Sequence, residues 1–131
     1  MSNDTLDKYI EHRPKVFDPD KILVYLNALD KNKIKAEDDY EEIKDQMQEQ
    51  LDFIITEKVE NLKCSIALAK VKATNDDRYK EIRATYRKRK AYYLLKKVEA
   101  NNGHSYCENL KQKSINQLAI DKLTLKHQCL Y

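Results

Sequence analysis

The scarcity of turn-forming residues constrains the fold of this chain more than any other feature of its sequence. The 131 residues include one glycine, Gly103, and two prolines, Pro14 and Pro19. A sheet protein with several hairpins needs more turn residues than this, whereas helices joined by short polar loops need few. We therefore predict an all-α protein with one helical domain over residues 18 to 131, preceded by a polar N-terminal arm over residues 1 to 17.

A short helix is predicted from residue 19 to residue 30. Asp18 can accept hydrogen bonds from the free backbone N–H groups at its start, and Pro19 suits the first helical position. The polar run from residue 31 to residue 33 predicts its end. The apolar positions that recur in it at steps of four and three are Ile22, Leu26 and Leu29.

A second, much longer helix is predicted from residue 36 to residue 73. Its apolar residues follow one another at steps of almost always three or four, which is the pattern of one helical face. No glycine or proline interrupts the pattern. At 1.5 Å per residue this helix would be about 57 Å long, so its far end needs support from another chain or from helices that fold back along it. The apolar positions are Tyr40, Ile43, Met47, Leu51, Ile54, Ile55, Val59, Leu62, Ile66, Ala69 and Ala73.

Two further helices are predicted over residues 77 to 101 and 105 to 126. The stretch from Thr74 to Asp77 fits a capping arrangement, and the stretch from Ser105 to Glu108 is a capping box. Between them, Asn101 to Gly103 predicts a helix end, because asparagine and glycine tolerate left-handed backbone angles. The short connections fold these elements into a long antiparallel helical hairpin or a three-helix bundle.

Charge is segregated along the chain, although the formal net charge is only +3. Residues 38 to 61 contain nine acidic residues and two lysines, whereas residues 78 to 97 contain nine basic residues and one glutamate. A hairpin that turns near Asn75 brings Lys96 close to Asp52, and the basic start of the second arm close to lysines of the first. We therefore expect a net basic turn and an acidic open end, which either attracts a polyanion or stacks head to tail with further copies.

The run from Arg87 to Lys90 covers more than one helical turn, so no single face can bury all four side chains. Tyrosines flank this run, and basic residues interleaved with aromatic rings suit single-stranded nucleic acid. A competing interpretation applies to Tyr79, Tyr86 and Tyr93, whose seven-residue spacing places them on one face and favours a core or interface role. A membrane-surface role ranks low, because this helix lacks large apolar anchors such as Trp or Phe.

The sequence shows no motif for catalysis, metal binding or phosphate binding. The three cysteines and three histidines have no metal-ligand spacing, one glycine cannot form a phosphate-binding loop, and the acidic residues fall all around their helix. We expect no enzymatic activity, no metal and no cofactor. The odd number of cysteines favours a reducing compartment, and without an apparent signal peptide or membrane span we expect a cytoplasmic protein, in the host cytoplasm if it is viral. The cysteines and histidines in question are Cys64, Cys107, Cys129, His12, His104 and His127.

Three stretches of the sequence resemble one known family. The stretch from Ile66 to Ala73 ends in small and basic residues, Asp77-Arg78-Tyr79-Lys80 follows, and leucine and alanine recur at helical spacing from Leu110 to Ile120. In this order, over roughly residues 50 to 126, they resemble the small helical recombination mediators of tailed phages, the UvsY type. The basic run from Arg87 to Lys90 departs from that family's pattern.

The resemblance implies a non-enzymatic protein that binds single-stranded DNA, helps to load a strand-exchange recombinase and forms a ring-like homo-oligomer. The candidate nucleic-acid-binding residues are Lys70, Lys72, Arg78, Lys80, Arg83, Arg87, Lys88, Arg89 and Lys90. The candidate base-stacking residues are Tyr79, Tyr86 and Tyr93.

The long amphipathic helix supports an alternative function. The chain would then be a protein-interaction module, such as a scaffold, or a viral inhibitor that docks on a host or defence protein. Self-association is expected under both hypotheses, because exposed apolar stripes of this length are rare on monomers.

Overall fold

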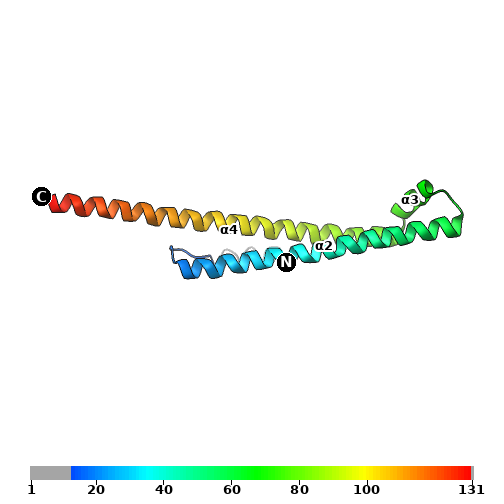
Figure 1. The fold of residues 1–131 in the computed structure, drawn as a ribbon, viewed down its shortest axis with the longest axis horizontal. Helices are drawn as coiled ribbons and strands as arrows, with labels where there is room; N and C mark the ends of the chain where they lie inside the picture. The colour runs from blue at the N-terminus through cyan, green and yellow to red at the C-terminus, as the bar shows by residue number, and fades with distance from the viewer. Residues whose placement is uncertain (1–12, 131) are drawn as a thin grey trace. The chain divides into compact units, whose positions relative to one another are not determined.

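The computed structural model describes residues 13 to 130, and three α-helices make up nearly all of this part (Figure 1). They are α2 (Pro19–Leu62), α3 (Ile66–Thr74) and α4 (Asp77–Leu130). The described chain contains no strand, so the predicted all-α fold class is confirmed. Residues 1 to 12, which form most of the expected arm, lie outside the described residues.

Helix α2 begins as predicted. The backbone N–H groups of Asp20 and Lys21 donate to the Asp18 carboxylate, at 3.1 and 3.4 Å, and Pro19 is the first helical residue. The predicted end at residues 31 to 33 was wrong, because α2 continues through them. Lysine and asparagine cost a helix only a few tenths of a kcal/mol each, and neither residue breaks the backbone as proline would.

The predicted helix from residue 36 to residue 73 is interrupted where the sequence carries no glycine or proline. Helix α2 ends at Leu62, and Lys63 takes the left-handed conformation with φ of 48°. Cys64 Sγ then donates to the Lys58 carbonyl at 3.6 Å, which satisfies one of the acceptors left free at the helix end. Ser65 caps α3 by accepting a hydrogen bond from the Leu68 N–H at 3.3 Å.

Helix α4 begins at Asp77 as predicted but continues to Leu130, so a separate helix starting at residue 105 was a wrong prediction. Gly103 lies buried inside α4 instead of ending a helix. A Cβ atom at this position would collide with the Leu29 side chain and contact the Tyr25 ring. Glycine here therefore permits close packing and does not act as a helix terminator.

The described residues group into two compact units. In unit 1, residues 13 to 31 and 97 to 130 share a small core of side chains from α2 and α4. The Tyr106 hydroxyl donates to the Pro14 carbonyl at 2.6 Å, and His104 Nε2 lies 3.0 Å from Asp30 Oδ1. The buried core residues are Ile22, Tyr25, Leu29, Ala100 and Cys107. The prediction of one helical domain over residues 18 to 131 stays a prediction.

Unit 2 runs from Asn32 to Lys96 and contains an antiparallel pair of α2 and α4 segments, with α3 beside the end of α2 (Figure 1). Tyr40 contacts Tyr93, while Glu57, further along α2, contacts Arg78 near the start of α4. The predicted helical hairpin is thus confirmed, but its pairing differs from the expected one. Because residues 63 to 74 form a turn and α3 instead of extending the arm, α4 pairs with an earlier part of α2.

Candidate nucleic-acid interface

The nine candidate cations occupy different settings in unit 2. Lys70 and Lys72 lie exposed on α3, and Arg78 takes part in an ion-pair network at the start of α4. The remaining six lie on α4 between residues 80 and 90, on two sides of the helix. The structure therefore does not gather all nine into one patch.

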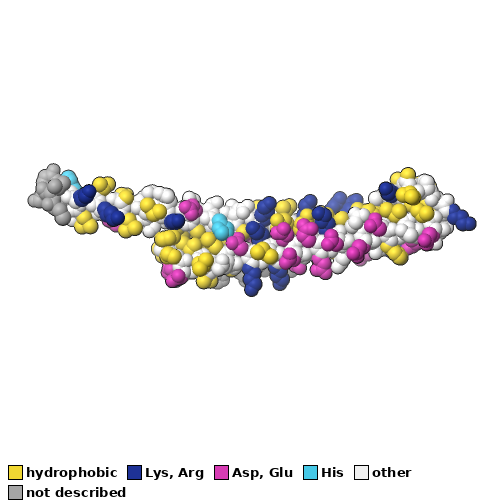
Figure 2. Space-filling view, viewed as in Figure 1, with side chains coloured by type: hydrophobic (Ala, Val, Ile, Leu, Met, Phe, Trp, Pro, Cys, Tyr) yellow, Lys and Arg dark blue, Asp and Glu magenta, His cyan; other side chains and the backbone are white. Residues whose placement is uncertain are grey.

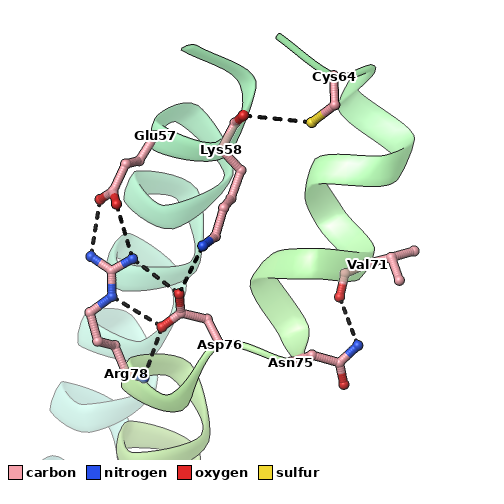
Figure 3. A network of polar contacts seen from close by, with 7 residues as sticks. All are labelled: Glu57, Lys58, Cys64, Val71, Asn75, Asp76 and Arg78. Atoms are coloured by element: carbon pink, nitrogen blue, oxygen red, sulfur yellow. Dashed lines mark hydrogen bonds and ion pairs between the residues drawn. The ribbon is translucent and has the colours of Figure 1, made fainter. Parts of the chain in front are cut away.

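Arg78 lies between two carboxylates from different elements (Figure 3). Its guanidinium donates to both Glu57 carboxylate oxygens, at 3.0 and 3.2 Å, and to Asp76 Oδ1 at 3.0 Å. Lys58 Nζ completes the network 3.4 Å from Asp76 Oδ2. Two cations face two carboxylates, so Arg78 does not contribute the uncompensated positive charge that the sequence led us to expect at the turn.

The same network shifts the protonation of its acids. The hydrogen bonds from Arg78, assisted by Lys58, hold the pKa of Asp76 far below its ordinary value. Hydrogen bonding from Arg78 also lowers the pKa of Glu57. Asp76 additionally accepts the Arg78 backbone N–H at 2.9 Å, as an N-cap of α4 does. These residues connect the end of α2 to the start of α4, so their role is structural.

Four cations of α4 form a row that we name the cation stripe: Lys80, Arg83, Arg87 and Lys90. Their steps of three, four and three residues place them on one helical face over about 15 Å. No carboxylate of the described residues lies within ion-pair distance of these side chains. Arg83 is half-buried and the other three are exposed, so the stripe presents uncompensated charge to the solvent.

Each of the three candidate stacking tyrosines contacts a cation or the Tyr40 ring of α2. Tyr40 of α2 stacks on Tyr93, with ring centroids 5.5 Å apart and an interplanar angle of 2°, and meets Tyr86 at 5.7 Å. Burial and a hydrogen bond with Tyr86 raise the pKa of Tyr40. Arg83 covers the Tyr79 ring at 5.9 Å. This arrangement matches the core role that their seven-residue spacing favours.

A groove of about 420 Å³, which we name the Tyr92 groove, lies between α2 and α4 within unit 2. Arg89 Nη1 crosses it to donate to the Asp39 carbonyl at 3.5 Å. Tyr92 is 51% exposed, and Lys96 Nζ lies 5.2 Å from the centroid of its ring. The lining residues are Ala36, Asp39, Glu42, Gln46, Lys88, Arg89 and Tyr92.

Tyr92 is the ring that sequence reasoning left out of the candidate site. The signal for it was its position one residue before Tyr93, which breaks the seven-residue spacing and turns the side chain about 100° away from the packed rings. The acidic residues that line the groove, Asp39 and Glu42, were not among the predicted site residues either, because the sequence shows them only as part of the acidic stretch from residue 38 to residue 61.

The electrostatic surface of unit 2 limits the approach of a polyanion. Figure 2 shows acidic side chains gathered along the α2 segment of this unit and Lys and Arg side chains along the neighbouring α4 segment. Like charges along α2 repel a polyanion, whereas the cation stripe attracts it. Any polyanion must therefore be bound from the α4 side.

The fold and these surfaces define an all-α protein whose helical hairpin separates acidic from basic residues. No family model matches the chain, no curated protein is similar to it, and no solved structure matches it. The resemblance to phage recombination mediators therefore stays an expectation. Within residues 13 to 130, no helix is long and apolar enough to cross a membrane. In that same range, no three His, Cys, Asp or Glu side chains are placed to hold a metal ion.

Proposed function

We propose that this chain is a non-enzymatic accessory protein of phage recombination or replication that binds single-stranded nucleic acid and acts as an oligomer. The observation that carries the binding step is the cation stripe on α4, four basic side chains in a row without carboxylate partners among residues 13 to 130. The assignment to recombination, with a recombinase as partner, rests on the sequence resemblance.

The physical basis of binding is the release of counterions. A nucleic acid carries condensed cations along its phosphates, and each lysine or arginine that neutralises a phosphate frees part of them. Four aligned cations therefore give an affinity that falls steeply as salt rises. Because Arg83 and Lys90 lie over the Tyr79 and Tyr86 rings, the stripe is suited to phosphates more than to bases.

A comparison of two charge-reversal variants tests this proposal. In the first, the stripe residues Lys80, Arg83, Arg87 and Lys90 are replaced by glutamate. In the control, four exposed lysines elsewhere on α4, Lys111, Lys113, Lys122 and Lys126, are replaced in the same way. We expect a fluorescently labelled single-stranded oligonucleotide to bind the wild-type protein at low salt.

The stripe variant should lose this binding, whereas the control variant should retain most of it. Circular dichroism on both variants verifies that the helices remain. A wild-type protein that binds no oligonucleotide at low salt, or a stripe variant that binds as well as the control, would overturn the proposal.

A second candidate function, a protein-interaction module, is favoured by the apolar surface of α4 in unit 1. Beyond Cys107, five large apolar side chains between residues 115 and 125 are each about half to two-thirds exposed. Surfaces of this kind mark protein–protein contacts, including self-association. They are Ile115, Leu118, Ile120, Leu123 and Leu125.

Light scattering separates these functions. If the apolar surface mediates self-association, the variant with Leu118 and Leu125 replaced by lysine should have a lower oligomeric mass than the wild-type protein. A monodisperse wild-type monomer would contradict self-association in either function. A defined protein partner in the absence of any affinity for nucleic acid would favour the interaction module.

A further inference from the structure

We infer that the Tyr92 groove binds one unpaired base of the nucleic acid and prefers a base that carries an exocyclic amino group. This inference rests on the proposed function and adds a subsite to it. The groove holds an exposed ring, two cations and two carboxylates within one space of about 420 Å³. The ring can stack on a base, the cations can bind a phosphate, and the carboxylates can accept hydrogen bonds from an amino group.

The α4 wall of the groove supplies a ring face and positive charge. Tyr92 is the more exposed of the two neighbouring tyrosines, since Tyr93 is packed on Tyr40. An exposed aromatic ring can stack on any base, because every base has a π-face. Lys96 lies over one face of the Tyr92 ring, so a base would stack on the other face. Lys88 and Arg89 are exposed on the same wall and can hold the phosphate of the stacked nucleotide.

The α2 wall supplies hydrogen-bond acceptors. Asp39 and Glu42 are exposed and face the cations of α4 across the groove. Ionised carboxylates only accept hydrogen bonds, so they favour the amino groups of cytosine, adenine and guanine. The O4 atom of thymine or uracil, an acceptor itself, would be repelled. Thymine and uracil keep one donor, the N3–H group, but present an acceptor at position 4, so the wall distinguishes bases by their exocyclic group.

The sequence connects this groove to the cation stripe. Arg87 and Lys90 belong to the stripe, whereas Lys88 and Arg89 between them line the groove. Four consecutive residues span slightly more than one helical turn, so they form a continuous basic path around α4. A strand whose phosphates lie on the stripe can follow this path and place one base beside Tyr92.

Acidic side chains in the groove argue against a site for phosphates alone. A purely anionic ligand would meet Asp39 and Glu42 at close range, and like charges repel. A ligand with a negative phosphate and a base that donates hydrogen bonds satisfies both walls. A peptide segment with acidic and basic side chains is the competing occupant, and equal affinities for the two oligonucleotides below would exclude the base in its favour.

The test compares two oligonucleotides of equal length, oligo-deoxycytidine and oligo-deoxyuridine, on the full-length protein at equal salt. The two bases differ at position 4, where cytosine has an amino group and uracil an oxygen, and at N3, where cytosine accepts a hydrogen bond and uracil donates one. We expect the cytosine strand to bind about tenfold more tightly, the discrimination typical of one well-placed base contact. Equal affinities would overturn the inference and leave the proposed function standing.

Variants of the groove assign this preference to its residues. Replacing Tyr92 by alanine should weaken both strands about tenfold without changing the salt dependence, because stacking and not charge is lost. Tyr92→Phe should bind as the wild type does, since the ring is retained. An unaffected Tyr92→Ala variant would show that the base lies elsewhere and would overturn the inference.

A matched pair of acidic variants completes the test. Glu42→Gln should bring the ratio of the two affinities close to one, because its amide can pair with either base. The control is Glu49→Gln, an equally exposed α2 residue outside the groove, which should keep the full ratio. An unchanged ratio in Glu42→Gln would contradict the role of this wall. Failure of the wild-type protein to bind either strand at low salt would instead overturn the proposed function and this inference together.

Discussion

Arg78 and Glu57 are joined by two hydrogen bonds of 3.0 and 3.2 Å, although 21 positions separate them in the chain. The pair fixes the first turn of α4 against the last turns of α2, and Asp76 holds the same guanidinium from the connection that follows α3. The 13 or so residues between α2 and Asp76 are thereby excluded from the hairpin pairing. Together with the Tyr40–Tyr93 stack, this pair marks the register of unit 2.

The Arg78 network should make the stability of the protein depend on acid pH. The pKa of Asp76 is lower in the folded protein than in the unfolded chain, so its ionised form stabilises the fold at neutral pH. This stabilisation is present above the ordinary carboxyl pKa of about 4 and is lost as the pH falls below it. Replacing Arg78 by methionine should lower the free energy of unfolding at neutral pH.

Urea unfolding followed by circular dichroism between about pH 7 and about pH 2 measures this effect. The difference between the wild type and Arg78→Met should shrink as the acids are protonated. A difference that stays constant over this range would contradict the role of the network.

Neighbouring tyrosines should respond to substitution in opposite ways. Tyr93 is stacked on Tyr40 and half-buried, so Tyr93→Ala should cost about 2–3 kcal/mol of stability. Tyr92 is mainly exposed, so Tyr92→Ala should change stability by less than about 0.5 kcal/mol. Thermal or denaturant unfolding of the two variants checks this, and equal costs would contradict the assignment of one ring to the core and the other to the groove.

Gly103 should accept a larger side chain only at the cost of moving the buried Leu29 side chain. Because the Leu29 side chain occupies the space that a Cβ atom would need, Gly103→Ala should destabilise the protein by about 1–3 kcal/mol. This sign is informative, since in an unhindered helix the same change would stabilise by about 1 kcal/mol. Asn102→Ala is the control, because Asn102 is an exposed neighbour whose replacement should be neutral or slightly stabilising.

Replacing Lys63 by glycine should stabilise the protein. Its φ of 48° places a side chain in the left-handed region, which costs an L-residue about 1 kcal/mol and costs glycine almost nothing. Lys63→Gly should therefore raise the free energy of unfolding by up to about 1 kcal/mol. The control Asn61→Gly lies within the last turn of α2 and should instead lower it slightly, by about 0.3 kcal/mol. A destabilised Lys63→Gly would contradict the left-handed end of α2.

Much of the fold was predictable because periodicity and capping are local signals. The cap at Asp18 and the start of α4 at Asp77 were both predicted from short-range chemistry. The end of α2 at Leu62 was not, because a lysine in the left-handed conformation leaves no glycine or proline in the sequence. Gly103 was predicted to end a helix but lies inside α4, since its role is to make room for Leu29, more than seventy positions away.

The candidate site was predictable to a lesser degree, since it depends on which residues face each other. The basic run was visible in the sequence, but the compensation of Arg78 by Glu57 required the pairing register. The separation of the cation stripe from Lys88 and Arg89 follows from helical geometry alone. The groove beside Tyr92 could not be predicted, because its second wall comes from α2 and is set by the unexpected register.

The salt dependence of binding tests the central claim most directly. For a single-stranded oligonucleotide held by four cations, the logarithm of the association constant should fall with the logarithm of salt at a slope of about −3. Arg87→Gln should reduce the magnitude of that slope by about 0.7, while Lys113→Gln, also on α4 but outside the stripe, should leave it unchanged. A slope near zero, or one that Arg87→Gln and Lys113→Gln alter equally, would contradict binding through the cation stripe.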